Sequence, residues 1–167
     1  MIKQITDTYS GVITINYENN TVIKKFSPSV INEGLMGREV FWLKHLEKFD
    51  RTPQIIEVTD DSIVMTYVGE RISKESVPDD WKTQVLYISE GLKKYKCSHN
   101  DIKPEDIQVK DGIIYIVDFG WSTRIGEPIP SHWSTGIGDD FKYGIHDFND
   151  LYSLTKSIEF VLSNKDV

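Results

Sequence analysis

The sequence lacks the features that mark an extracellular or membrane protein. It has a single cysteine, Cys97, among 167 residues, so no internal disulfide can form and nothing indicates an oxidising compartment. No apolar run approaches the ~18 residues that a membrane span needs. Residues 1–4 also lack the apolar core of a signal peptide. We therefore expect a soluble protein of the cytoplasm that makes no contact with a membrane.

Positive charge is also scarce. The chain has 19 Lys and Arg against 26 Asp and Glu, which gives a formal net charge of -7. Because nucleic acids bind proteins through a basic footprint, we expect no nucleic-acid partner. Hydrophobic residues make up 39% of the 167 residues, and this content and length predict a single globular domain over residues 1–167 with a real core.

Residue patterning predicts a mixed chain in which strands dominate the first third. Runs of β-branched and aromatic residues, separated by turn residues, indicate strands. These lie in a hairpin at 12–26, in single strands at 54–58 and 62–68, and in a second hairpin at 107–117. Apolar residues at helical spacing indicate helices. These lie at 31–49, 81–95 and 147–162, and a long loop is expected at 120–144.

The most informative segment is residues 98–106, which read Ser-His-Asn-Asp-Ile-Lys-Pro-Glu-Asp, and it is followed after the second hairpin by Val-Asp-Phe-Gly at 117–120. The carboxylate of Asp101, with Lys103 two positions later, can accept a hydroxyl proton beside a phosphate that the lysine holds. Asp106 and Asp118 flank the hairpin, which can bring two oxygen ligands to one side of a Mg²⁺ ion. The pattern favours phosphoryl-transfer chemistry.

These motifs and the hairpin between them resemble the catalytic and metal-binding loops of protein kinases, His-Arg-Asp-Leu-Lys-Pro-Glu-Asn followed by Asp-Phe-Gly. The resemblance extends over roughly residues 5–160. It implies an α+β, bilobal protein-kinase-like fold. The N-lobe, residues 1–68, would hold an antiparallel sheet and one helix. The C-lobe, residues 69–167, would be mainly helical and truncated, because the chain stops just after the central helix. It would be a minimal, atypical kinase.

The resemblance assigns catalytic roles to four residues. Asp101 would orient and deprotonate the acceptor hydroxyl, and Lys103 would neutralise charge on the γ-phosphoryl group. Lys24, in Val22-Ile23-Lys24, would pair with the α- and β-phosphates of ATP. Glu39, on the following helix, would hold Lys24 in place.

The resemblance also implies a nucleotide site and a metal site. Asp106 and Asp118 would hold Mg²⁺, with Mn²⁺ as an alternative. The residues that would line the ATP site are Gly11, Ile13, Val22, Lys24, Met65, Thr66, Tyr67, Val68, Gln108 and Asp118. Further along the chain, Asp150 would brace the backbone of the loop at 99–101, and Leu43 would stack on Phe119.

Several positions depart from the kinase pattern. Of the Gly-rich loop, only Gly11 remains within residues 6–11. Asn100 replaces the arginine that docks a phosphorylated activation loop, so we do not expect regulation by such phosphorylation. Asp106 replaces the metal-binding asparagine, which adds a negative charge. Gln108 stands where the floor of the adenine pocket is usually aliphatic.

Three functions are compatible with these residues. The first is an ATP- and Mg²⁺-dependent phosphotransferase acting on Ser or Thr of a protein, because Lys103 two residues after Asp101 resembles Ser/Thr protein kinases. The second is a pseudokinase that binds a partner and catalyses nothing. The third is a small-molecule kinase whose acceptor pocket is built by residues 120–144. A partner protein or a second copy would cover the apolar surface of a truncated C-lobe.

Overall fold

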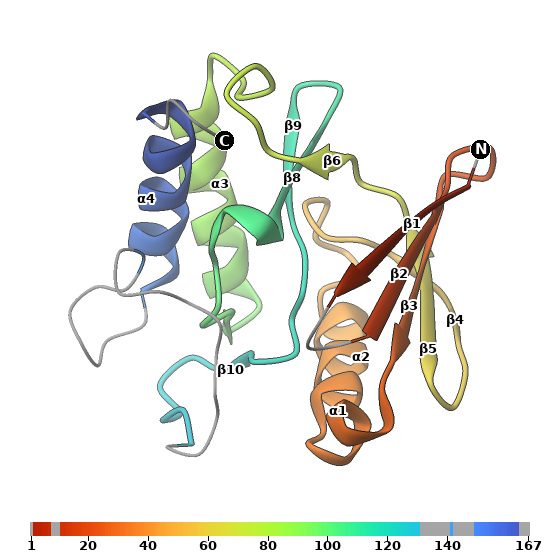
Figure 1. The fold of residues 1–167 in the computed structure, drawn as a ribbon. Helices are drawn as coiled ribbons and strands as arrows, with labels where there is room; N and C mark the ends of the chain where they lie inside the picture. The colour runs from red at the N-terminus through yellow and green to blue at the C-terminus, as the bar shows by residue number, and fades with distance from the viewer. Residues whose placement is uncertain (1, 8–10, 131–140, 142–148, 164–167) are drawn as a thin grey trace.

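The computed structural model describes residues 2–7, 11–130, 141 and 149–163 (Figure 1). Its first half is a five-stranded antiparallel sheet in the order β1-β2-β3-β5-β4. The strands are β1 (Ile2–Asp7), β2 (Gly11–Asn16), β3 (Thr21–Phe26), β4 (Ile55–Val58) and β5 (Ser62–Thr66). The predicted hairpin at 12–26 and both single strands are confirmed. β1 was not predicted, because its two isoleucines are spaced by three residues rather than two.

The predicted helix at 31–49 is wrong in its extent. The structure has two helices there, α1 (Pro28–Asn32) and α2 (Leu35–His45), so the sheet is accompanied by two helices instead of one. Gly34 separates them with a φ of +84°, a left-handed conformation that interrupts the helix and that glycine adopts at little cost. Leu46 and Phe49 are buried beyond the end of α2. The apolar pattern that predicted a helix to residue 49 therefore marks buried residues that lie beyond the end of α2.

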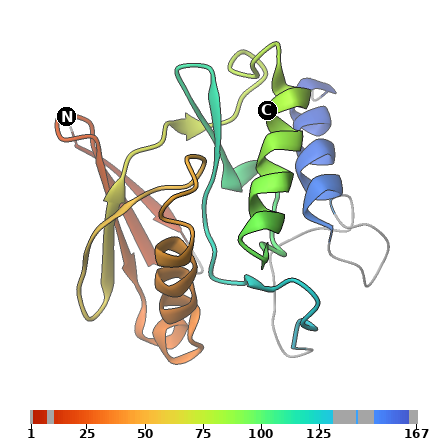
Figure 2. The same ribbon diagram turned by 180° about the vertical axis from the view of Figure 1, so that it is seen from behind.

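The second half combines two long helices with several short strands (Figures 1 and 2). Helices α3 (Trp81–Lys94) and α4 (Asp150–Ser163) lie side by side. The short elements are β6 (Glu70–Arg71), β7 (Cys97–Ser98), the 3₁₀ turn η1 (Pro104–Asp106), β8 (Ile107–Lys110), β9 (Ile113–Ile116) and β10 (Thr123–Arg124). They form a three-stranded sheet, β6-β8-β9, and a β7-β10 pair, both antiparallel. No helix in the described ranges has the length and apolar character of a membrane span.

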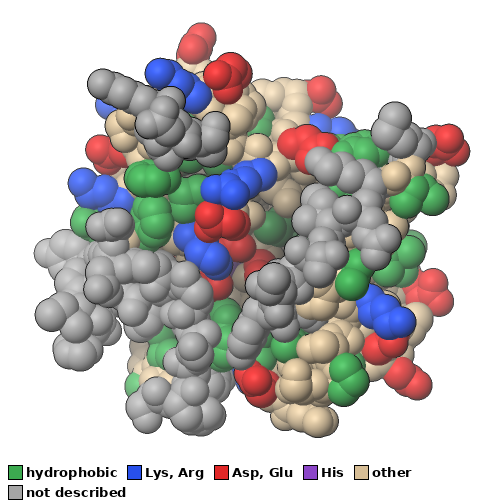
Figure 3. All heavy atoms as spheres, in the orientation of Figure 1, with side chains coloured by type: hydrophobic (Ala, Val, Ile, Leu, Met, Phe, Trp, Pro, Cys, Tyr) green, Lys and Arg blue, Asp and Glu red, His purple; other side chains and the backbone are tan. Residues whose placement is uncertain are grey.

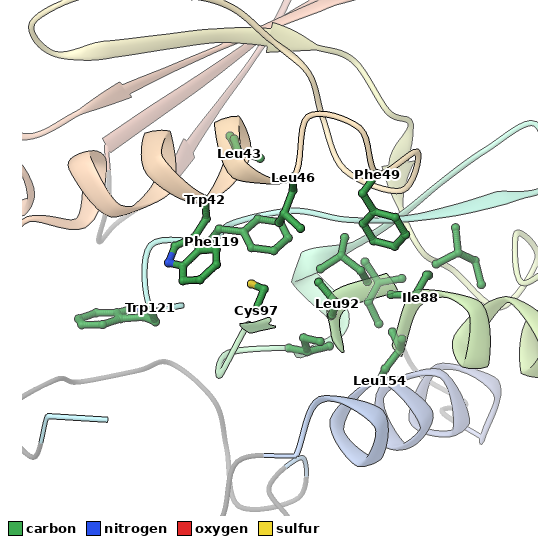
Figure 4. Packing of buried hydrophobic residues seen from close by; sticks show 14 of the residues in the cluster. Trp42, Leu43, Leu46, Phe49, Ile88, Leu92, Cys97, Phe119, Trp121 and Leu154 are labelled. Carbon is green, nitrogen blue, oxygen red and sulfur yellow. The ribbon is translucent and has the colours of Figure 1, made fainter. Parts of the chain in front are cut away.

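One hydrophobic cluster joins the two halves (Figure 4). Leu43 of α2 and Leu92 of α3 are buried in it together with Leu154 of α4. Phe119, which follows β9, is completely buried in the same cluster. Burying a side chain of this size stabilises the fold by about 1.5–3 kcal/mol. The shared core therefore fixes the segment after β9 relative to both α2 and α3, and that segment carries candidate site residues.

A buried glutamine on α3 ties the two halves together through its amide group. The Oε1 atom of Gln84 accepts hydrogen bonds from Arg51 Nη1 at 2.8 Å and from the backbone N–H of Ile114 at 2.9 Å. Its Nε2 atom donates to Asp80 Oδ1 and to the Gly112 carbonyl, both at 2.8 Å. Each polar atom of the amide is thus satisfied, and the turn of the β8–β9 hairpin is held against α3.

Replacing Gln84 by leucine is expected to lower the free energy of unfolding by about 2–4 kcal/mol, because the buried N–H of Ile114 and the Gly112 carbonyl lose their partners. Urea unfolding of wild type and Q84L measures the loss. The exposed neighbour on the same helix provides the control, since T83L should stay within about 0.5 kcal/mol of wild type. A loss below about 1 kcal/mol in Q84L would contradict this role of the amide.

Candidate active site

The first charged cluster joins the N-terminal sheet, helix α2 and the segment after β9. Lys24 on β3 points its Nζ atom at Glu39 Oε2 of α2, 2.9 Å away, and at Asp118 Oδ1, 3.3 Å away. Lys24 and Glu39 are both buried. Asp118 has a φ of +69°, a left-handed conformation that non-glycine residues adopt at a cost and that concentrates at functional sites. Residues that are far apart in the sequence therefore meet at one ammonium group.

The charges in this cluster support one another. Burial alone would lower the pKa of Lys24, but the carboxylates of Asp118 and Glu39 outweigh it and raise that pKa above its ordinary value. Burial alone would raise the pKa of Asp118, but Lys24 and Lys103 outweigh it and hold the pKa below its ordinary value. Lys24 and Asp118 are therefore both ionised at neutral pH.

The second charged cluster is a lysine between two buried carboxylates. Lys103 Nζ lies 2.8 Å from Asp101 Oδ2 and 2.8 Å from Asp106 Oδ2. The other oxygen of Asp101, Oδ1, is buried and accepts no hydrogen bond within the described part of the chain. A buried acceptor without a partner is costly in a folded protein, so this oxygen is available to a donor from a ligand.

Burial dominates the ionisation of both carboxylates. It raises the pKa of Asp101, although Lys103 opposes the shift. It raises the pKa of Asp106 well above its ordinary value, again against Lys103 and with help from the negative charges of Asp118 and Asp101. The pKa of Lys103 is raised because these carboxylates outweigh its own burial. A raised pKa makes Asp101 a stronger proton acceptor than an ordinary aspartate.

A scaffold of hydrogen bonds fixes the loop that carries Asp101. Asp150, at the start of α4, accepts from the backbone N–H groups of His99 at 2.7 Å and Asn100 at 3.1 Å. The Nδ1 atom of His99 accepts from the backbone N–H of Asp101 at 3.1 Å, so Nε2 carries the proton and donates to the Val117 carbonyl at 2.8 Å. His99 therefore links the Asp101 loop to the strand end before Asp118, and Asp150 braces the loop as predicted.

A cavity of about 570 Å³ lies beside both clusters, between the N-terminal sheet and the second half of the chain. This volume suits a small-molecule ligand of nucleotide size. The predicted site residues that line it are Ile13, Val22, Lys24, Glu39, Met65, Thr66, Tyr67, Val68, Lys103, Asp106, Gln108 and Asp118. Gly11 and Asp101 are not among the described lining residues.

Comparisons with known proteins agree with this architecture. No protein-family model matches the sequence, and no curated protein matches it by sequence. Among solved structures, the chain is similar to the kinase PK-1 of the Cydia pomonella granulovirus, with a TM-score of 0.61. The match covers 97% of this chain and 68% of the viral chain at 18% sequence identity. The chain has a protein-kinase-like fold. The fold that the sequence motifs implied is thereby confirmed.

Within this kinase-like fold, Gly11 has a structural reason to be glycine. Its φ is +134°, and a Cβ atom there would lie 2.0 Å from the Lys25 carbonyl oxygen of the neighbouring strand. Gly69 is similar, because a Cβ atom would lie 2.1 Å from the Val109 carbonyl oxygen. Gly69 lies in the segment 67–69 that connects β5 to β6. Gly11 therefore allows a close approach between β2 and β3, and Gly69 allows one between the segment after β5 and strand β8.

Sequence reasoning missed three charged residues that line the cavity, Glu70, Arg71 and Glu105. Arg71 Nη2 lies 2.9 Å from Glu105 Oε1, and the Tyr17 hydroxyl donates to Glu70 at 2.5 Å. Acidic and basic side chains gather side by side near the centre of the face in Figure 3. Glu105 lies within the motif at 98–106 but no role was assigned to it, and no motif marks Tyr17 or the β6 residues Glu70 and Arg71. Ile15, which also lines the cavity, could have been found from its i+2 spacing to Ile13 on β2.

The donor set at the cavity suits a hard cation that a nucleotide brings with it. Asp106 and Asp118 both line the cavity and offer carboxylate oxygens. No group of three or more His, Cys, Asp or Glu side chains with metal-binding geometry occurs in the described residues. Mg²⁺ commonly binds one or two carboxylates and completes its shell with phosphates and water. The residues therefore fit a Mg²⁺–nucleotide complex better than a permanent metal centre.

Proposed function

We propose that the chain is an ATP- and Mg²⁺-dependent phosphotransferase that uses Asp101 as its catalytic base. The observation that carries this proposal is the convergence of the two charged clusters on one cavity. Lys24 and Lys103 supply the cations that a polyphosphate needs in a chain of net charge -7. The kinase-like fold, shared with a protein kinase, supports the same reading.

The proposed roles follow from the contacts of each residue. Lys24, held by Glu39, binds the α- and β-phosphates of ATP. Gln108 and the segment from Met65 to Val68 surround the adenine ring. Asp106 and Asp118 would hold Mg²⁺, and the bound ion would neutralise phosphate charge. The acceptor hydroxyl donates a hydrogen bond to the free Oδ1 of Asp101 and passes its proton there as its oxygen bonds to the γ-phosphorus of ATP. The bond between that phosphorus and the β,γ-bridging oxygen breaks at the same time, and ADP leaves with the bridging oxygen. Lys103 stabilises the negative charge that the transferred group carries.

We propose a Ser or Thr hydroxyl of a protein as the acceptor. The support is the lysine two positions after Asp101, as in Ser/Thr protein kinases, together with the name of the similar viral enzyme. A small-molecule acceptor is tested in the same assay with a set of metabolites. We place the protein in the cytoplasm, in keeping with its buried free thiol at Cys97.

The D101N variant tests the proposed function. Transfer of phosphate from Mg²⁺-ATP to generic protein substrates, or to the chain itself, is expected to fall about 10²–10⁴-fold, because the amide cannot accept the proton. ATP affinity measured by calorimetry should remain within about threefold of wild type, since Asp101 does not line the cavity. The D111N variant, the same substitution at the exposed tip of the β8–β9 hairpin, provides the control.

Two results would overturn the proposal. Wild-type protein that neither binds nor turns over Mg²⁺-ATP would exclude an ATP-dependent enzyme. Wild-type protein that binds ATP but transfers phosphate to no protein, to no metabolite and not to itself would instead support a pseudokinase. Transfer to a metabolite alone would keep the reaction and replace the acceptor.

A further inference from the structure

One face of helix α2 packs against the segment that follows Asp118. The residues of this face are Leu35, Arg38, Glu39 and Trp42, at the spacing i, i+3, i+4 and i+7 that places side chains on one side of a helix. Glu39 reaches Asp118 through Lys24, as described above. The other three residues contact positions 120–122, which we call the anchor segment.

The contacts of α2 with the anchor segment are direct. Arg38 Nε donates to the Gly120 carbonyl at 2.7 Å, and its guanidinium lies 5.6 Å from the centre of the Trp121 ring. Trp42 Nε1 donates to the Ser122 carbonyl at 3.2 Å. A Cβ atom on Gly120 would lie 3.5 Å from Leu35, so the backbone passes close to the helix. Figure 4 shows Trp42, Phe119 and Trp121 along one side of the core.

The catalytic loop holds the same segment from the opposite side. Asn100 Nδ2 donates to the Trp121 carbonyl at 3.0 Å and to Thr123 Oγ1 at 2.9 Å. Thr123 also pairs with Ser98 in the β7–β10 ladder. The three consecutive carbonyls of residues 120, 121 and 122 therefore each accept a hydrogen bond from a different side chain. Two of these donors come from α2 and one from the loop that carries Asp101.

None of these hydrogen bonds involves a phosphate group. The donors are an indole, an amide and a guanidinium, and the acceptors are backbone carbonyls and a hydroxyl. Trp42, Asn100, Ser122 and Thr123 are all buried, so the bonds form where water does not compete for them. Asn100 stands where an arginine would dock a phosphorylated loop, and here its amide binds the backbone of that loop directly.

We propose that Arg38, Trp42 and Asn100 are positioning residues that hold the anchor segment, and through it Asp118, in the catalytic position without phosphorylation. This proposal rests on the proposed phosphotransferase function. On this proposal the site is assembled at all times. Hydrogen bonds from side chains to backbone carbonyls connect the anchor segment to α2 and to the loop that carries Asp101. Loss of one donor loosens the segment and displaces Asp118 from Lys24, while the other residues that line the cavity stay in place.

The test uses R38M and W42F with K44M as the control. W42F removes the N–H donor but keeps an aromatic ring, and K44M makes the same kind of change as R38M at an exposed position of α2. Hydrogen exchange of the backbone amides at 119–124 should rise about tenfold or more in R38M and W42F, with exchange in α4 unchanged. The turnover rate should fall about tenfold or more, with KM for the acceptor within about threefold. K44M should match wild type in both measurements.

The outcomes separate this proposal from the proposed function. Exchange at 119–124 that stays at the wild-type level in R38M and W42F would overturn the positioning role, whether or not the protein transfers phosphate. Equal rises in 119–124 and α4 would show general destabilisation and would also overturn it. Wild-type protein stripped of phosphate by a phosphatase should keep its full turnover rate. A loss of about tenfold or more after this treatment would contradict assembly without phosphorylation.

Discussion

Replacing Asp118 by asparagine is expected to reduce phosphoryl transfer on the order of a thousandfold, because the variant removes a charge at the site proposed for Mg²⁺ and the phosphates. Asp118 is the carboxylate that Lys24 contacts from the second half of the chain, at 3.3 Å, and it also lines the cavity. Its lowered pKa keeps it ionised throughout the neutral range. An amide at this position would keep the shape of the side chain but not its charge.

The D118N variant is expected to remain folded, since Lys24 keeps Glu39 at 2.9 Å as a buried partner. Because the pKa of Asp118 is lowered in the folded protein, D118N should also change the pH dependence of stability. A carboxylate with a lowered pKa stabilises the native state above its unfolded pKa of 3.8, and this stability is lost as the pH falls through the folded pKa. D118N should therefore lose less stability than wild type when the pH falls below about 4.

Turnover and Mg²⁺-dependent ATP affinity together measure the effect of D118N. The ratio of ATP affinities with and without Mg²⁺ should approach one in D118N, while affinity without Mg²⁺ should not decrease. D60N, at an exposed turn of the N-terminal sheet, is the matched control and should behave as wild type. A D118N protein with transfer within about fivefold of wild type would remove Asp118 from the mechanism.

The sequence was sufficient to predict the residues of the two charged clusters, but not the residues and backbone atoms that surround them. Asp101, Lys103 and Asp118 could be found because their motifs have a fixed spacing. Lys24 and Glu39 then followed from the strand and helix that the resemblance requires. The fold class was predictable for the same reason, since the alternation in β2 and β3 and the helical spacing in α3 are local signals.

What could not be predicted depends on contacts between distant residues and backbone atoms. Arg38 and Trp42 bind carbonyl oxygens of residues 120 and 122, and a carbonyl has no sequence signature. Arg71 meets Glu105 only because β6 pairs with β8. The break of the helix at Gly34 depends on a backbone conformation that a glycine permits but does not require. These features decide how rigidly the site is held.

Replacing Lys103 by methionine is expected to lower the free energy of unfolding by about 3–5 kcal/mol at neutral pH, in addition to the loss of transfer. The side chain of Lys103 is 19% exposed, whereas those of Asp101 and Asp106 are only 3% and 5% exposed. Methionine keeps most of the packing of the lysine stem, so the loss in free energy of unfolding reports the removal of the positive charge. Without the ammonium group, the two buried carboxylates repel each other and lose their ion pairs with Lys103.

The pH dependence identifies the source of this loss. Burial raises the folded pKa of Asp101 and of Asp106, so above pH 3.8 the native state binds more protons than the unfolded state. Stability then falls as the pH rises towards the folded pKa values of the two carboxyl groups. In K103M the lysine that lowers these pKa values is gone, so the fall extends to a higher pH. Urea unfolding of K103M should therefore show a larger loss at pH 8 than at pH 5. K25M, which removes an exposed ion pair with Asp61, should cost less than about 1 kcal/mol at either pH.

A second substitution separates charge from packing at the same site. Asp106→Asn in the K103M background removes one of the two opposed carboxylates, and restores the asparagine that the kinase pattern has at this position. It should recover at least half of the stability lost at pH 8, since Asp101 no longer faces the carboxylate of Asp106 across position 103. At pH 5 the recovery should be smaller, because a protonated carboxyl already relieves the repulsion. A double variant no more stable than K103M at pH 8 would mean that the loss comes from packing of the lysine stem, and that Lys103 does not act as the shared counter-charge of Asp101 and Asp106.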